Sequence, residues 1–340
     1  RNKSAHPSGH SPSAEEARYI FSESISRFLS KPILSAHQVS DEILESLGGG
    51  NLFPTLKVSD YATMVQHELT RMSLEGLPYL LNKLISNLDS PNETIKTNAL
   101  RFILGMGCEG AKDETISSIK KILIEKQIHK TERENCIILI ISCNYKLLEN
   151  LSPPTYIRLN EAIIRNNDQA DLTSPTNKTK NPLQNLKSIS KLSPEFSKLN
   201  FSRSASSIIN KFKYNTDLYQ IVENNSWMLD LLFETLLNEA RHYDFTNANN
   251  FAKFIVNADG AVCKILTSKQ CFSLLVGIYK ANTYGANYSE RIIENEFKSI
   301  PLIKEKALTG VREEKEQYEE ILKEISGDDS LNIDTFLTSE

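Results

Sequence analysis

The chain has 340 residues, of which 40% are hydrophobic and 24% charged, and its formal net charge is −4. This composition is typical of a globular protein long enough for two domains. The acidic balance argues against a nucleic-acid partner, and no stretch approaches the ~18 apolar residues needed to cross a bilayer. The polar N-terminal residues lack the apolar core of a signal peptide. We therefore expect a cytoplasmic protein that is not transmembrane and at most lies peripherally on membranes.

The first half of the chain is predicted to be helical throughout. Residues 1–14 are polar and are expected to form a disordered lead. Apolar residues then recur at helical spacing between Pro, Gly and Asn/Asp/Ser breaks. The predicted helices cover 14–29, 40–47, 59–72, 77–88, 95–106, 115–128, 133–148 and 153–165. Residues 137–141 are rich in isoleucine and could form a strand, but their helical surroundings favour a buried helix.

The strongest single pattern is a helix hairpin over 77–106. Leucine and isoleucine recur at helical spacing up to Leu88, residues 89–92 break the run, and a second apolar stripe starts at Ile95. A hairpin of short helices cannot bury its apolar face alone, so it must stack on neighbouring hairpins. The pattern predicts an all-α fold in which 15–165 form a right-handed α-solenoid.

The composition changes at 166–205, which hold seven serines, three prolines and no glycine. Scattered apolar residues without a clear period predict a linker here. Within this linker Ser202 and Ser204 flank a basic residue, which makes them candidate phosphorylation sites. A second helical domain is expected over 206–326, followed by an acidic, frayed tail at 327–340.

Motifs that would indicate catalysis are weak in this chain. The three glycines at 48–50 lack the Lys-Ser/Thr of a phosphate-binding loop and favour the end of a helix. His67 and His242 have no partner at metal-ligand spacing, and no Gly-x-Ser-x-Gly motif occurs. The cysteines are interpreted as small buried residues without a metal or redox role. They are Cys108, Cys136, Cys143, Cys263 and Cys271. We expect no catalytic, cofactor-binding or metal-binding residues.

The best electrostatic feature is a basic segment that contains Lys126, Lys130 and Arg133. Their spacing of i, i+4 and i+7 would place three cations on one helical face. Such a face would bind phosphoinositide head groups weakly, or an acidic peptide. Three glutamates lie close by in the sequence, so the alternative interpretation is an ordinary solvated face of mixed charge.

A family resemblance covers about the region from Tyr61 to Lys121. The matching sequence segments are VQHELTRM at 65–72, LLNKL at 80–84 and IKTNALRFIL at 95–104. This order of helices resembles the ENTH/VHS superfamily, the superhelical domains of vesicle-trafficking adaptors of the epsin and tepsin type. The resemblance implies an adaptor with a flexible linker and a second helical domain. Residues 1–14 lack the basic helix with which epsins fold onto phosphoinositides, so recruitment by proteins is implied.

A second resemblance lies in the other half of the chain. DFTN at 244–247 and AVCKI at 261–265 look like a stretch of Ras-type guanine-nucleotide exchange domains, and ELT at 68–70 looks like another of their motifs. In that interpretation the helices around 227–266 would open the nucleotide site of a small GTPase. The two pieces stand much farther apart here than in that family, so this is the alternative.

The sequence therefore predicts a non-catalytic protein-interaction module that serves as an accessory adaptor in vesicle or membrane trafficking. Its expected partners are coat or adaptor proteins, or a small GTPase under the exchange-factor alternative. A HEAT-like scaffold is the second alternative, because HEAT hairpins have similar sequence patterns. The sequence does not identify the partner, the cargo or the oligomeric state.

Overall fold

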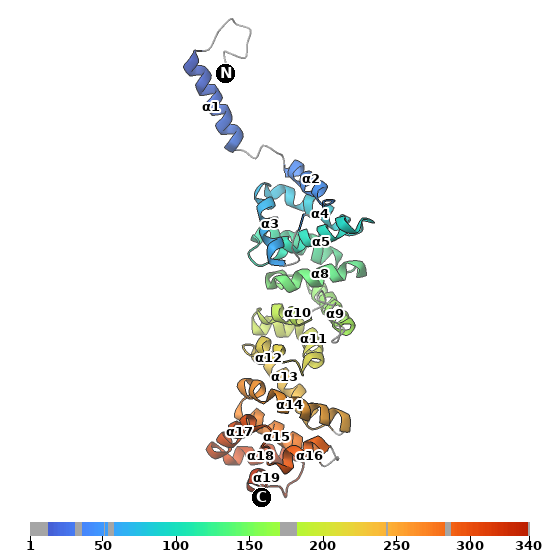
Figure 1. Cartoon of the computed structure of the whole chain (residues 1–340), viewed down its shortest axis with the longest axis vertical. Coiled ribbons are helices and arrows are strands. Elements are labelled where there is room, and N and C mark those ends of the chain that lie inside the picture. Colours follow the sequence, from blue (N-terminus) through green and yellow to red (C-terminus); the bar gives the residue numbers. More distant parts are fainter. Residues whose placement is uncertain are drawn as a thin grey trace. The chain divides into compact units, whose positions relative to one another are not determined.

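The computed structural model describes residues 13–30, 36–50, 52–53, 58–170, 182–242, 244–282 and 287–338. Every regular element within these ranges is a helix, and they contain no strand (Figure 1). The chain divides into two compact units, Arg1–Leu151 and Ser152–Glu340. The predicted all-α class is therefore confirmed for the described residues. The predicted disordered lead at 1–14 lies almost wholly outside them.

The first unit contains eight α-helices in its described part. They are α1 (Ala14–Ser30), α2 (Ala36–Ser46), α3 (Val58–Thr70), α4 (Leu77–Asn87), α5 (Glu93–Gly107), α6 (Asp113–Ile119), α7 (Glu125–Gln127) and α8 (Thr131–Cys143). Short turns of 3-10 helix, η2 (Leu74–Gly76) and η4 (Tyr145–Leu148), and a π-helical segment, η3 (Lys120–Ile124), complete it. The isoleucine run at 137–141 lies within α8 and is largely buried, so the helical interpretation is confirmed.

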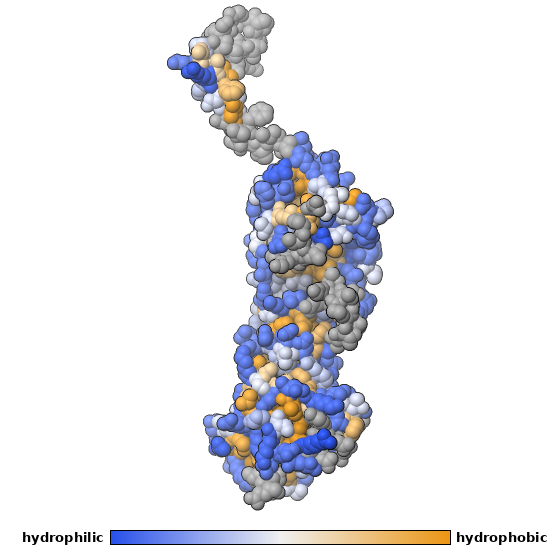
Figure 2. All heavy atoms as spheres, viewed as in Figure 1, coloured by the Kyte–Doolittle hydropathy of each residue, from blue (hydrophilic) through white to orange (hydrophobic). Residues whose placement is uncertain are grey.

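Helix α1 begins with a reciprocal capping box. The Ser13 hydroxyl accepts the backbone N–H of Glu16 at 3.1 Å, and the Glu16 carboxylate accepts the N–H of Ser13 at 2.9 Å. This helix leaves apolar side chains in solvent, since Tyr19 and Phe21 are 67% and 68% exposed. Figure 2 shows apolar residues along one side of this helix.

The hairpin of α4 and α5 agrees closely with the prediction from the apolar pattern. Asn92 caps α5, because its side chain accepts the N–H groups of Thr94 and Ile95 at 2.9 and 3.3 Å. Leu84 and Phe102 are 0% and 2% exposed, so the two apolar stripes form core. Helix α5 also packs against α3 and α8.

The three glycines at 48–50 follow the end of α2 and are held by α5. The buried Asn98 side chain donates to the carbonyls of Leu47 and Gly49 at 2.9 and 3.1 Å. These two hydrogen bonds satisfy backbone carbonyls of the glycine loop and fix the loop against α5. The expected helix-terminal role of this segment is confirmed.

The second unit contains eleven helices in its described part. They are α9 (Pro153–Gln169), α10 (Pro182–Ser190), α11 (Pro194–Phe212), α12 (Thr216–Val222), α13 (Ser226–Ala240), α14 (Phe245–Ile265), α15 (Ser268–Asn282), α16 (Asn287–Glu294), α17 (Pro301–Glu313), α18 (Lys315–Ser326) and α19 (Ile333–Thr338). Successive odd-numbered helices from α9 to α17 pack on one another, and α10, α12, α14 and α16 form a second packed series.

The predicted linker at 166–205 requires correction. Its first residues complete α9, residues 171–181 lie outside the described part, and the remainder forms α10 and most of α11. Helix α11 buries Phe201, Ala205 and Ile208 at helical spacing. The boundary between the units falls after Leu151 rather than at the serine-rich segment.

Serine and asparagine residues of this segment form hydrogen bonds between α9 and α11, and we call this set of contacts the polar seam. Asn160 donates to the carbonyl of Asn200 at 2.6 Å and accepts the N–H of Ser204 at 3.2 Å. Two turns later, Asn167 donates to the carbonyl and hydroxyl of Ser207 at 3.1 and 2.9 Å. Asn160, Asn167 and Ser204 are buried, Asn200 and Ser207 are half-buried, and each of the five has a hydrogen-bond partner across the helix interface.

Replacing Asn160 by alanine should lower the free energy of unfolding of the second unit by about 1–3 kcal/mol. The change removes both cross-helix bonds from a site that is 6% exposed. Denaturant unfolding followed by the fluorescence of Trp227, the single tryptophan, measures the loss. Asn257→Ala is the matched control, because the exposed Asn257 donates only to the carbonyl of Lys253 on its own helix. Equal midpoints for both variants would contradict a stabilising seam.

The acidic tail at 327–340 also differs from expectation. Helix α19 buries Phe336, whose ring centroid lies 5.4 to 5.7 Å from those of Phe272, Tyr279 and Phe297. Lys315 pairs with Asp334 at 2.8 Å. The described part of the tail therefore docks on the unit through an aromatic cluster rather than fraying, and residues 339–340 lie outside the described part.

Candidate functional site

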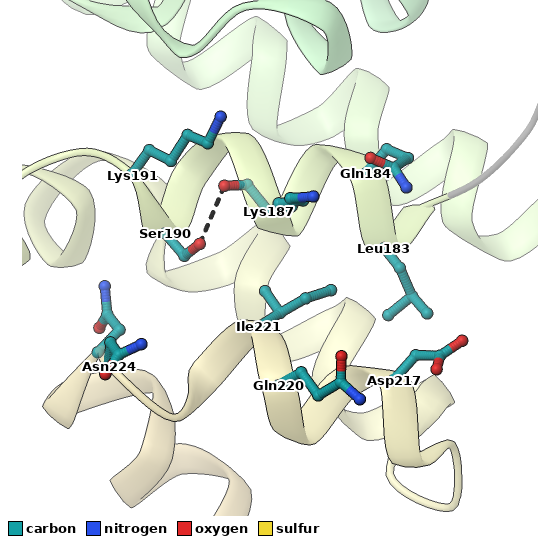
Figure 3. A pocket seen from close by; sticks show the side chains of 10 residues that line it. Leu183, Gln184, Lys187, Ser190, Lys191, Asp217, Gln220, Ile221 and Asn224 are labelled. Carbon is teal, nitrogen blue, oxygen red and sulfur yellow. Dashed lines mark hydrogen bonds between the residues drawn. The ribbon is translucent and has the colours of Figure 1, made fainter.

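A groove with a volume of about 510 Å³ lies between α10 and α12 (Figure 3). The two helices pack against each other within the second unit. Leu183 from α10 and Ile221 from α12 point into the space between them. Ile221 is only half-buried, so an aliphatic surface remains open at the base of this groove. We call this feature the α10–α12 groove.

One wall of the α10–α12 groove is basic. Lys187 and Lys191 are exposed residues one helical turn apart, and Asp217 on α12 is the acidic residue in the lining. Two lysines against one aspartate leave a local charge of +1 in a protein whose net charge is −4. Lys187 lies on α10 and Lys191 directly follows its end, so both cations border the groove from the α10 side.

Amide side chains complete the lining. Gln184, Gln220 and Asn224 are exposed along the two walls and offer both donors and acceptors. The buried Asn225 at one end caps α13, because it accepts the N–H of Met228 at 3.4 Å. The Ser190 hydroxyl donates to the carbonyl of Lys187 at 2.9 Å (Figure 3). Such a lining is suited to a peptide that carries apolar, amide and acidic groups.

The predicted basic face is not brought together by the structure. Lys126 lies on α7 and Lys130 directly precedes α8, and the chain turns between these helices, so the spacing of one continuous helix does not apply. Both lysines are exposed, but Arg133 is buried and ion-paired with Asp89. The hydrogen bond from Arg133 lowers the pKa of the Asp89 carboxyl. Arg133 therefore serves to join α8 to the turn of the α4–α5 hairpin.

The two candidate phosphorylation sites lie on α11. Ser202 is exposed, whereas Ser204 is 0% exposed and its hydroxyl donates to the carbonyl of Phe201 at 3.2 Å. A kinase needs an accessible hydroxyl in an extended segment, so the prediction is wrong for Ser204 in the folded chain. Serine content alone does not indicate flexibility here, because Ser204 lies at the interface of α11 with α9 and donates its N–H to Asn160.

The histidines and cysteines of the described residues do not form a metal site. His242 accepts the N–H of Asp244 at 3.0 Å, and the described residues contain no group of three or more His, Cys, Asp or Glu side chains able to hold a metal ion. Three cysteines are buried, while Cys143 and Cys263 are half-buried. The structure brings the segments of Cys108 and Cys143 together, because the side chain of Asn144 donates to the Cys108 carbonyl at 3.2 Å, and no spacing in the sequence indicates this.

Comparison with known proteins finds no matching family model, no matching curated protein and no matching solved structure. Among the described helices, none has both the length and the apolarity of a membrane span. The functional interpretation therefore depends on the groove and on the helix arrangement.

Proposed function

We propose that this chain is a non-catalytic protein-interaction module of α-solenoid type, whose α10–α12 groove binds a peptide segment of a partner protein. The two packed helix series of the second unit support the solenoid assignment, because stacked helix pairs contact mainly their neighbours. Such stacks present extended surfaces that suit protein partners. The second unit would then be the second helical domain of an adaptor.

The α10–α12 groove is the observation that carries this proposal. Its aliphatic base offers a place for one apolar anchor, and its amides can pair with peptide N–H and C=O groups. Lys187 and Lys191 favour carboxylates beside that anchor. The occupant is therefore an extended acidic peptide with a leucine-like side chain at its centre.

The resemblance of Tyr61–Lys121 to the ENTH/VHS superfamily supports placing this module among the accessory adaptors of vesicle trafficking. The exchange-factor alternative has less support. Its two pieces in the second half lie on one helix, α14, and the third lies in the first unit. Nucleotide release from a panel of small GTPases distinguishes the two, and acceleration by this chain would favour the exchange factor.

The groove is tested by fluorescence anisotropy with a short labelled peptide of Asp, Glu and Gly around a central Leu. The double variant Lys187→Glu/Lys191→Glu should weaken binding roughly 5–30-fold, because reversing two exposed charges changes the binding free energy by about 1–2 kcal/mol. Binding to the wild type should also weaken as salt rises.

The matched control is Lys198→Glu/Arg203→Glu, which makes the same charge change on exposed positions of α11. This control should bind the acidic peptide like the wild type. A second peptide, with Lys in place of each acidic residue, should not bind. Equal loss in both double variants would show that net charge alone attracts the peptide, and unchanged binding in the Lys187/Lys191 variant would exclude the groove.

A further inference from the structure

Two cysteines that are distant in the sequence meet at the ends of two packed helices in the first unit. Cys108 directly follows α5, and Cys143 is the last residue of α8. Helices α5 and α8 pack on each other, and the hydrogen bond from Asn144 to the Cys108 carbonyl places their C-terminal ends side by side. Each thiol donates to a carbonyl one turn before it, Cys108 to Leu104 at 3.1 Å and Cys143 to Leu139 at 3.3 Å, and the two thiols lie close enough to shift each other's pKa. This pair is distinct from the α10–α12 groove, which lies in the other unit.

The backbone beside both thiols is held firmly. Asn144, which is 3% exposed, donates from its side chain to the carbonyl of Cys108 at 3.2 Å. A Cβ atom added to Gly107 would lie 2.6 Å from Cγ1 of Ile140. Only a glycine permits α5 to approach α8 this closely. The residues adjoining each cysteine are thus in direct contact with the opposite helix.

The two thiols differ in exposure and in acidity. Cys143 is half-buried, and the nearby Cys108 thiol lowers the pKa of the Cys143 thiol. The same interaction, followed by burial, raises the pKa of the Cys108 thiol. Reactivity towards disulfides follows the thiolate fraction and access. Cys143 therefore has the properties of an attacking thiol, and Cys108 those of a protected neighbour.

We propose that Cys108 and Cys143 form a dithiol modification site that a low-molecular-weight disulfide oxidises to an intramolecular disulfide. The Cys143 thiolate attacks one sulfur of the small disulfide and forms a mixed disulfide, releasing the other half as a thiolate. Cys108 then attacks the Cys143 sulfur and displaces the remaining half, and the proton of Cys108 passes to that leaving thiolate. The protein loses two electrons and two protons, and the small disulfide is reduced to two thiols.

The experiment treats the fully reduced chain with oxidised glutathione and follows the intact mass and the peptide map with time. We expect a product linked between Cys108 and Cys143 without retained glutathione. In Cys108→Ser, glutathione should remain on Cys143, because no resolving thiol is present. In Cys143→Ser, the Cys108 position should stay unmodified for as long as the helices are folded.

Cys263→Ser is the control, because Cys263 is also half-buried. It should leave the Cys108–Cys143 product unchanged, and in the wild type Cys263 should react more slowly than Cys143. The wild-type peptide map alone is decisive and does not depend on the folding of any variant. A map without the Cys108–Cys143 link, or with Cys263 modified before Cys143, would overturn the proposal.

Discussion

Replacing Phe102 by alanine should lower the free energy of unfolding of the first unit by about 3–5 kcal/mol. Phe102 lies on α5, is 2% exposed, and its ring centroid is 6.4 Å from that of Phe53. Truncation removes the transfer free energy of the ring and leaves a cavity that the surrounding helices fill only in part. Leu84→Ala on α4 should cost about 2–5 kcal/mol for the same reason. Denaturant unfolding followed by far-UV circular dichroism measures both.

Leu74→Ala is the matched control in the same unit. Leu74 is 53% exposed, so the loss of its side chain should change stability by less than about 0.5 kcal/mol. If Phe102→Ala and Leu84→Ala had the same midpoint as the wild type, the apolar stripes of the hairpin would face solvent. They would then form a binding surface instead of core.

Gly310→Ala should destabilise the second unit by about 1–3 kcal/mol, despite the higher helix propensity of alanine. Gly310 lies on α17, and an added Cβ would be 1.8 Å from the hydroxyl oxygen and 2.6 Å from Cζ of Tyr318. Tyr318 is 2% exposed and packs edge-on against Phe272 at 5.1 Å. Its ring therefore has no free space into which it can move. The fluorescence of Trp227 during denaturant unfolding reports the change.

Gly260→Ala is the control, and we expect it to stabilise the second unit instead of destabilising it. Gly260 lies inside α14, and the nearest atom to an added Cβ is Cδ1 of Leu302 at 3.6 Å, an ordinary contact. Alanine should there stabilise by up to about 1 kcal/mol through helix propensity. Adding Tyr318→Phe to Gly310→Ala should recover part of the loss, because the closest clash involves the hydroxyl. Equal effects at both glycines would contradict a steric origin.

The α4–α5 hairpin shows what local sequence can determine. Its apolar residues recur with the helical period, and Asn92 both interrupts the pattern and caps the next helix. These signals depend on neighbours a few residues apart, so they can be recognised without the fold. The composition of α11 predicts a linker instead of a helix, because serine and asparagine favour turns in isolation. Their buried partners on α9 are contributed by a distant segment.

The candidate site was also only partly predictable from the sequence. Lys187 and Lys191, with Leu183 before them, stand at helical spacing after Pro182, so α10 was open to detection from the sequence. The serine-rich composition around α10 favours a linker over a helix, so the basic residues at 126–133 are the stronger electrostatic signal in the sequence. The structure shows that a turn between α7 and α8 separates those cations and that Arg133 is buried against Asp89.

The sequence by itself determined the helical class, most helix positions of the first unit and the apolar stripes that became its core. Periodicity and capping encode these features locally, within one or two turns. Only the tertiary structure decided that α10 faces α12 across a groove, that α9 and α11 share a polar seam, and that Cys108 meets Cys143. Each of these contacts joins residues of different helices. Their meeting depends on how whole helices pack, which no local pattern specifies.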